Sequence, residues 1–159
     1  MLSSEEAKQL WDLVEPLETA MLVTYEDNIL QARPMYLAQK EFSGSFYFFT
    51  EHPTEKTEAI EHAQEVCLAF SGIKSQTFVS VSGRASLCQD KQLIAKLWNP
   101  FVASWFPQGK DSPSVALIKV DAYQAEYWQG KGAKVVQLFK YGKAYLTGKR
   151  PNIGEHGHL

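Results

Sequence analysis

The sequence predicts a mainly β fold, an antiparallel barrel with a few helices at its periphery. Short apolar runs that favour strands follow one another with only turn residues between them, as in hairpins. Helical patterns are few and do not alternate regularly with the strands, which argues against a doubly wound parallel sheet. No repeat or linker divides the 159 residues, so we expect one domain over residues 1–159, with a core at about 10–147 and a C-terminal tail at 148–159.

The first elements are expected to be a helix and a hairpin. Ser3 and Glu6 have the spacing of a capping box, and apolar residues then recur at helical intervals. Pro16 should end or kink this helix. The apolar runs 20–25 and 29–38 flank the polar turn Glu-Asp-Asn, which predicts two paired strands.

The rest of the chain favours further strands and two short helices. Apolar or alternating runs predict strands at 45–50, 65–70, 77–87 and 114–128, and the run 134–139 is a candidate for one more. Helices are expected at 54–63 and at 90–98, the second capped by Asp90 and stopped by Asn99-Pro100. Residues 100–113, rich in aromatic residues and bounded by prolines, are expected to form a connection.

The composition limits the function classes. A chain that is 45% hydrophobic and 13% aromatic is not disordered, and a net charge of −2 gives no general attraction to nucleic acid. No apolar run is long enough to span a membrane and no signal peptide is recognisable, so a cytoplasmic protein without membrane or nucleic-acid partners is expected. Cys67 and Cys88 fit buried free thiols better than a disulfide or a metal site. The C-terminal basic residues are interpreted as solvated surface charges: Lys131, Lys134, Lys140, Lys143, Lys149 and Arg150.

Two segments offer a possible anion site. Arg33 precedes Pro34 in an apolar strand, which must therefore lie at an edge or carry a bulge, and the arginine must reach solvent or meet an anion. Thr54 and Lys56 lie in the first turn of a predicted helix, where free backbone N–H groups favour an anion. A phosphate clamp is one hypothesis. A threonine N-cap beside a surface lysine is the other, and acidic neighbours such as Glu55 favour it.

The aromatic segment also has two interpretations. Trp98, Phe101, Trp105 and Phe106 could pack in the core or at a dimer interface, which is the favoured interpretation, or they could wall a pocket for a flat ring.

Histidines near the C-terminus could in principle bind a metal. Glu155, His156 and His158 lie within four residues, but on a terminal segment without an evident distant partner. A loose tail is therefore the favoured interpretation, and no metal site is expected. His52 and His62 lack the neighbours that hydrolase chemistry needs.

Several motifs occur in an order typical of one family. They are MLVTY, ARPMYL, FYFFTEHPTEK, EVCLAF, VSVSGRASL, LWNPFVASWFPQGKDSPSVALIKV and AEYW, over about residues 10–147. Together they resemble the general stress protein branch of the pyridoxamine 5′-phosphate oxidase-like, FMN-binding split-barrel superfamily. The resemblance implies a six-stranded antiparallel split β-barrel and a homodimer, with FMN, alternatively FAD, in a groove between the protomers.

The resemblance also implies a set of binding residues. Arg33 and Lys56 would hold the flavin phosphate, with Thr54 where the family often has serine. The isoalloxazine ring would lie against the main chain and side chains of Met35, Tyr36, Phe49 and Thr50. Trp105, and less directly Phe106, would approach from the partner protomer. No catalytic residue is assigned.

Two departures from the oxidase pattern narrow the expected activity. Glu55 stands where the oxidase has an arginine, which should weaken phosphate binding. Nothing after Trp128 resembles the Arg-Leu-His-Asp-Arg-like segment that recognises the oxidase substrate. Vitamin B6 oxidation is therefore not the expected activity. The resemblance implies instead a flavin-dependent oxidoreductase that uses NAD(P)H. The alternative is a flavin-binding or buffering stress protein without turnover; a vitamin B6 oxidase or a haem-binding relative is less expected.

Overall fold

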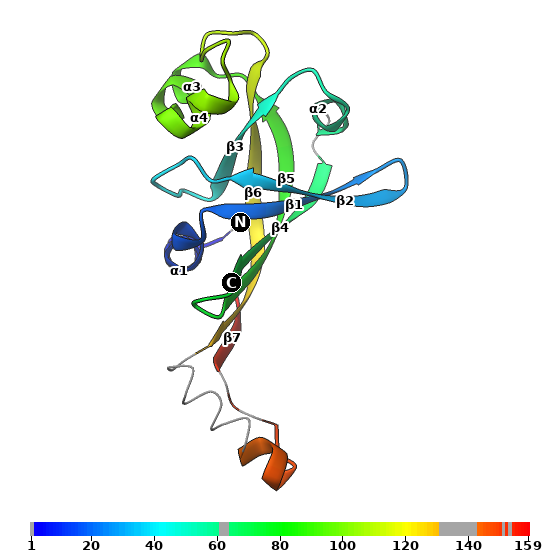
Figure 1. The fold of residues 1–159 in the computed structure, drawn as a ribbon, viewed down its shortest axis with the longest axis vertical. Coiled ribbons are helices and arrows are strands. Elements are labelled where there is room, and N and C mark those ends of the chain that lie inside the picture. Colours follow the sequence, from blue (N-terminus) through cyan, green and yellow to red (C-terminus); the bar gives the residue numbers. More distant parts are fainter. Residues whose placement is uncertain (1, 61–63, 131–142, 151, 153) are drawn as a thin grey trace.

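The structure is a computed structural model that describes residues 2–60, 64–130, 143–150, 152 and 154–159, without the side chains of residues 55, 56 and 59. The candidate strand at 134–139 lies outside this range, as do three of the six basic C-terminal residues, Lys131, Lys134 and Lys140. Within it, the predicted mainly β architecture is confirmed, with the sheet in the middle of the molecule and helices around it (Figure 1).

One antiparallel sheet carries the fold. Its strands are β1 (Thr19–Glu26), β2 (Ile29–Tyr36), β3 (Ser45–Glu51), β4 (Gln64–Gly72), β5 (Thr77–Cys88), β6 (Val115–Gly130) and β7 (Gly154–His158). Six strands follow the order β2-β1-β4-β5-β6-β3, and β7 pairs with the end of β6. The sheet curves into a barrel. This barrel stays open between β2 and β3, because these two strands end the path and do not pair with each other. This is the predicted split barrel.

The first hairpin has the register that its turn dictates. Asp27 and Asn28 adopt positive φ angles of 50° and 63°, the left-handed conformation that a two-residue hairpin turn requires and that these two residue types tolerate best. The pairing therefore runs from Glu26 opposite Ile29 to Thr19 opposite Tyr36. β2 is an edge strand, as Pro34 predicted.

The helices begin at capping residues that the sequence supplies. In α1 (Ser4–Val14) Ser3 and Glu6 form the predicted capping box, and a short 3₁₀ turn, η1 (Glu15–Leu17), follows at Pro16. The other helices are α2 (Glu55–Ile60), α3 (Lys91–Leu97) and α4 (Pro100–Trp105). No helix among the described residues is long and apolar enough to cross a membrane.

The expectation of a plain connection over 100–113 is wrong for its first part. Asn99 accepts a hydrogen bond from the Val102 N–H at 2.9 Å, and Pro100 occupies the first turn, where its missing N–H leaves no bond unmade. The aromatic residues of this segment therefore lie on a helix, α4, which fixes their directions.

Two apolar clusters meet at β3. The interior face of the barrel holds Phe46, Phe48 and side chains from β1, β4 and β5 such as Leu22, Leu68 and Val81. The other cluster joins α3 and α4 to the opposite face of β3 and to the start of β6. Since successive side chains of a strand point to opposite faces, β3 contributes to both clusters.

The C-terminal segment is not a loose tail. Residues 154–158 form β7, which pairs antiparallel with β6 from Glu126 opposite His158 to Gly130 opposite Gly154. The ladder continues at Leu159, whose N–H and C=O both bond to Ala125 at 2.7 Å. The sequence interpretation was wrong here because the pairing depends on a distant strand.

A polar contact across β4, β5 and β6 predicts a dependence of stability on pH. The Tyr123 hydroxyl donates to Glu65 at 2.8 Å and Arg84 pairs with the same carboxylate at 2.8 Å; both hold the pKa of Glu65 below its ordinary value. A lowered folded-state pKa stabilises the fold above the unfolded value of about 4.3, and this stabilisation is lost as the pH falls. Tyr123→Phe should therefore lower the Tm more at pH 7 than at pH 3.

Thermal unfolding monitored by circular dichroism at both pH values measures this difference. Tyr145→Phe, at an exposed tyrosine far along the chain, is the matched control and should leave the Tm unchanged. An equal loss at both pH values in Tyr123→Phe would contradict the expected role of the Glu65 carboxylate.

Candidate functional site

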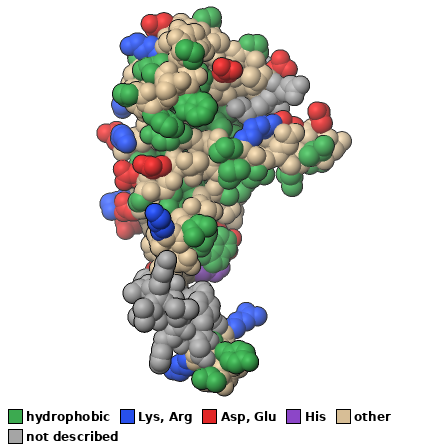
Figure 2. Space-filling model, viewed as in Figure 1, with side chains coloured by type: hydrophobic (Ala, Val, Ile, Leu, Met, Phe, Trp, Pro, Cys, Tyr) green, Lys and Arg blue, Asp and Glu red, His purple; other side chains and the backbone are tan. Residues whose placement is uncertain are grey.

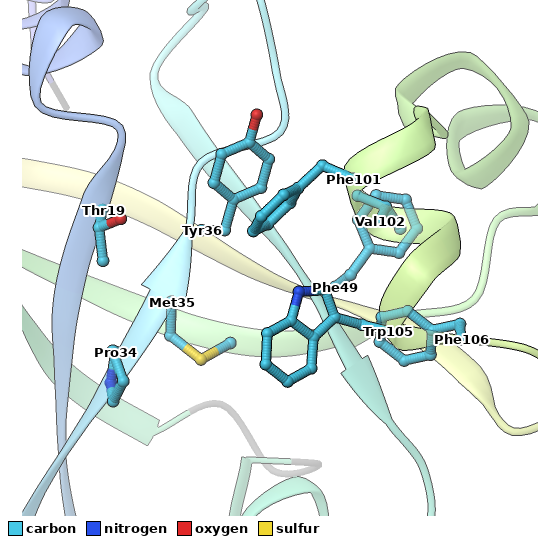
Figure 3. A pocket seen from close by; sticks show the side chains of 9 residues that line it. All are labelled: Thr19, Pro34, Met35, Tyr36, Phe49, Phe101, Val102, Trp105 and Phe106. Atoms are coloured by element: carbon cyan, nitrogen blue, oxygen red, sulfur yellow. The ribbon is translucent and has the colours of Figure 1, made fainter.

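A cavity of about 420 Å³ lies where the end of β2, the outer face of β3 and α4 meet (Figure 3). Five of its nine lining residues are aromatic. The full set is Thr19, Pro34, Met35, Tyr36, Phe49, Phe101, Val102, Trp105 and Phe106. In Figure 3 the Trp105 ring faces Met35 across the cavity, with Tyr36 and Phe101 along one side. Such flat, apolar walls suit a planar aromatic ligand.

The backbone explains why these side chains meet. Phe49 points away from the barrel interior because Phe46 and Phe48 alternate with it along β3 and fill the core. Phe101 and Trp105 are four residues apart on α4 and share one helix face, with ring centroids 6.5 Å apart. Phe101 also packs on Tyr36 at 4.3 Å, which ties the helix to the end of β2.

The outer wall of the cavity is open to solvent. Trp105 is 69% exposed, so a large part of its indole ring has no protein neighbour in the single chain. Figure 2 shows hydrophobic side chains gathered on this face around and below α4. The ring is therefore available to a ligand or to a second molecule.

Most of the predicted ring-binding residues are brought together here. Met35, Tyr36, Phe49 and Trp105 line the cavity, as does Phe106. Trp105 of the same chain lines the cavity, whereas the resemblance implied an approach from the partner protomer.

Thr50 and Trp98 are placed elsewhere. The Thr50 side chain is buried on the interior face of β3, opposite Phe49, and its hydroxyl donates to the Glu51 carbonyl at 3.2 Å. It is not among the residues that line the cavity. Trp98 packs edge-on against Phe49 with centroids 5.6 Å apart, so the packing interpretation holds for this residue.

Sequence reasoning missed three lining residues, Thr19, Pro34 and Val102. The hairpin register would have identified the first, because a two-residue turn at Asp27-Asn28 places Thr19 opposite Tyr36. Val102 was missed because the helix that carries it was not predicted.

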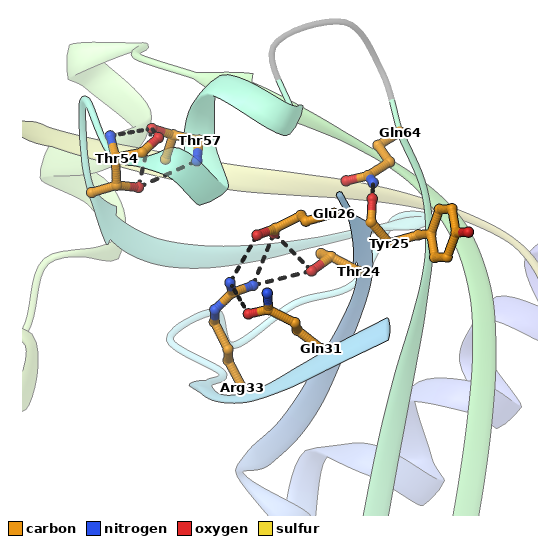
Figure 4. A network of polar contacts seen from close by, with 8 residues as sticks. All are labelled: Thr24, Tyr25, Glu26, Gln31, Arg33, Thr54, Thr57 and Gln64. Carbon is orange, nitrogen blue, oxygen red and sulfur yellow. Dashed lines mark hydrogen bonds and ion pairs between the residues drawn. The ribbon is translucent and has the colours of Figure 1, made fainter. Parts of the chain in front are cut away.

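Arg33 lies in a polar network on β1 and β2 (Figure 4). Its two terminal nitrogens each donate to one carboxylate oxygen of Glu26 at 3.0 Å, a bidentate pair. Nη1 also donates to the Thr24 hydroxyl at 3.0 Å and Nη2 to the Gln31 side-chain oxygen at 2.8 Å. The guanidinium thus holds an oxyanion already, one supplied by the chain itself.

Thr54 caps α2. Its hydroxyl accepts from the Thr57 N–H at 3.2 Å, and the Thr57 hydroxyl in turn accepts from the Thr54 N–H at 2.8 Å. The His52 ring nitrogen Nδ1 lies 3.0 Å from the same Thr57 hydroxyl. These bonds are those of a threonine N-cap, the second of the two hypotheses for this segment. Figures 1 and 4 both place α2 beside the outer half of the β1–β2 hairpin, on which Arg33 lies. The side chain of Lys56 is outside the described part of the structure.

The open antiparallel barrel, whose path ends at β2 and β3, places the protein in the class of split-barrel proteins. Comparison with known proteins identifies the family within it. Residues 5–152 match the model of the family described as "Pyridoxamine 5'-phosphate oxidase like". The chain belongs to this family.

Individual relatives agree with this assignment. Protein bli-3 of Neurospora crassa is 30% identical over 141 residues, which cover 79% of this chain and 68% of that protein. A general stress FMN/FAD binding protein from Xanthomonas citri is 31% identical, with a TM-score of 0.71 and coverage of 82% of this chain and 93% of that one. A putative general stress protein 26 from Jannaschia sp. CCS1 shares the fold, with a TM-score of 0.79, 22% identity and 99% coverage of both chains. The general stress protein branch that the motifs indicated is confirmed.

Proposed function

We propose that the protein binds a flavin, with the isoalloxazine ring in the aromatic cavity. The observation that carries this proposal is the meeting of Met35, Tyr36, Phe49 and Trp105 around one space of about 420 Å³. The description of the Xanthomonas citri relative as an FMN/FAD binding protein supports it. FMN is the first candidate and FAD the alternative. The side chains of the cavity would hold the ring between apolar surfaces and keep water from one of its faces.

The flavin phosphate would lie toward Arg33, with Thr54 and Lys56 as further ligands. A bidentate guanidinium suits a phosphate as well as it suits a carboxylate. Because Arg33 already binds Glu26 through both terminal nitrogens, a phosphate would have to displace at least part of this pair. Phosphate affinity at this corner therefore depends on Glu26 as well as on Glu55.

Bound FMN would supply the redox chemistry, with NAD(P)H as the electron donor. The nine lining residues include no Asp, Glu, His, Cys, Lys or Arg. The protein would thus contribute orientation and exclusion of water, while proton transfer would involve solvent. The same observation favours the second candidate function, a flavin-binding stress protein that holds the cofactor without turnover.

We further propose a homodimer in which a second copy covers the exposed rings of α4. Phe101 and Trp105 present apolar area that a single chain leaves in contact with water. Sedimentation velocity of the full chain, with and without FMN, measures this association.

The visible spectrum of the purified protein tests the proposed function. We expect a flavin spectrum, either as purified or after addition of FMN to the colourless protein. Under anaerobic conditions, bleaching on addition of NAD(P)H would support the oxidoreductase, and a spectrum that stays oxidised would support the binding protein. A colourless protein that ignores FMN would overturn both, and a Soret band would indicate haem instead.

Trp105→Ala should weaken FMN binding about tenfold or more, because stacking on an aromatic side chain is worth about 1–3 kcal/mol. Recovery of free FMN fluorescence on dilution gives the dissociation constant. Trp128→Ala is the matched control, since this tryptophan lies near the end of β6 and is not part of the cavity lining. Equal affinities of the two variants would place the flavin ring elsewhere.

A further inference from the structure

The pairing of β7 with β6 places two histidines beside a carboxylate. Glu126 lies opposite His158 and Trp128 lies opposite His156 in the antiparallel register. Side chains two residues apart on a strand share a face, so Glu126, Trp128, His156 and His158 project from the same side of this two-stranded ladder. The cluster lies at the far end of β6 from α3 and α4, well separated from the aromatic cavity (Figure 1).

The polar atoms of this cluster converge. His156 Nε2 lies 2.6 Å from Glu126 Oε1, and His158 Nε2 lies 3.7 Å from the same oxygen. One ligand atom from each of the three residues can be chosen so that all lie within 4.8 Å of one another. Glu126 is half-buried and both histidines are exposed, so an ion from solvent can reach them.

The cluster is supported by its surroundings. The Trp128 ring stacks on the His156 imidazole with centroids 5.1 Å apart and planes inclined by 4°, which limits rotation of that imidazole. Gly157 lets the strand lie against Tyr127, since a Cβ there would come within 2.6 Å of the tyrosine ring. The backbone bonds at Leu159 extend the ladder past both histidines. The ligands are thus carried by a paired strand.

We propose that Glu126, His156 and His158 form a binding site for a divalent transition-metal cation such as Zn²⁺. Two imidazole nitrogens and one carboxylate oxygen are a donor set typical of zinc, whereas Mg²⁺ and Ca²⁺ prefer oxygen ligands alone. Tetrahedral ligands at about 2.1 Å from zinc are about 3.4 Å apart, so small side-chain rotations would complete the site. Three protein ligands leave a further position for water or another ligand.

Isothermal titration of the full chain with ZnCl₂ tests this site. We expect saturable binding of one ion per chain. Glu126→Gln and His158→Ala should each weaken it at least about tenfold, since changes outside the ligand shell alone weaken metal binding about 10–100-fold. His52→Gln is the matched control, because this histidine lies next to α2 and not on β6 or β7. This variant should bind zinc as tightly as the unmodified protein does. Absence of saturation would overturn the proposal, and so would a zinc affinity in Glu126→Gln and His158→Ala equal to that of the unmodified protein.

Tryptophan fluorescence gives a second readout that reports the place of binding. Ni²⁺ at the site should quench Trp128 through the stacked His156 ring, and Trp128→Phe should remove this quenching while heat of binding remains. Quenching that persists unchanged in Trp128→Phe would show that the ion binds near another tryptophan and would also overturn the proposal.

Discussion

Arg33→Ala is expected to weaken FMN binding about 10–100-fold and to lower the free energy of unfolding by about 1–3 kcal/mol. The first effect follows from the loss of charge-assisted hydrogen bonds to the phosphate, each worth about 1.5–3 kcal/mol. The second arises because the Glu26 side chain is only 9% exposed and would lose its guanidinium partner. FMN fluorescence titration and urea denaturation measure the two effects separately.

Two further variants distinguish binding from stability. Glu26→Ala combined with Arg33→Ala removes both charges, so it should regain much of the lost stability without regaining FMN affinity. Glu26→Gln alone should raise FMN affinity, because the guanidinium is released from its internal carboxylate. Unchanged FMN affinity in Arg33→Ala would show that the phosphate does not lie at Arg33.

Phe46→Ala is expected to lower the free energy of unfolding by about 3–5 kcal/mol, the typical effect of removing a buried aromatic ring. Phe46 is fully buried at the centre of the barrel, with ring centroids of Phe42 and Phe70 at 4.5 and 5.8 Å. Ile73→Ala in the β4–β5 turn is the control. Because the Ile73 side chain is exposed, this change should alter the free energy of unfolding by no more than about 0.5 kcal/mol. Urea denaturation of the unmodified protein and the two variants measures this difference. A midpoint of Phe46→Ala similar to that of the unmodified protein would contradict the central place of Phe46 in the core.

The sheet was largely predictable because its strands carry local signals. The strand predicted at 77–87 is confirmed, with Val79 and Val81 on its buried face and the half-buried Ser80 and Ser82 on the other. The same alternation along β3 would have separated Phe49 from Thr50, since Phe46, Phe48 and Thr50 share the face of this strand that is buried in the barrel. The expectation that Phe49 and Thr50 both bind the ring rested on the family resemblance and did not take into account that side chains alternate between the two faces of a strand.

The parts that sequence reasoning missed depend on long-range pairing or on weak local preference. Gly-Glu-His-Gly-His has few strand-forming residues, and β7 forms because the end of β6 offers a free edge. α4 is short and rich in aromatic residues, so only the Asn99-Pro100 cap marks it. The pairing of Arg33 with Glu26 crosses the hairpin, and it could have been considered once the turn at Asp27-Asn28 fixed the register.

The edge position of β2 has a consequence for aggregation. An edge strand offers unpaired backbone groups to which a strand of another molecule can add, a route to fibrous growth. Pro34 interrupts that row because it has no N–H to donate. β2 is thus protected against edge-to-edge polymerisation, so the split in the barrel can remain open for a ligand without becoming a template for other chains.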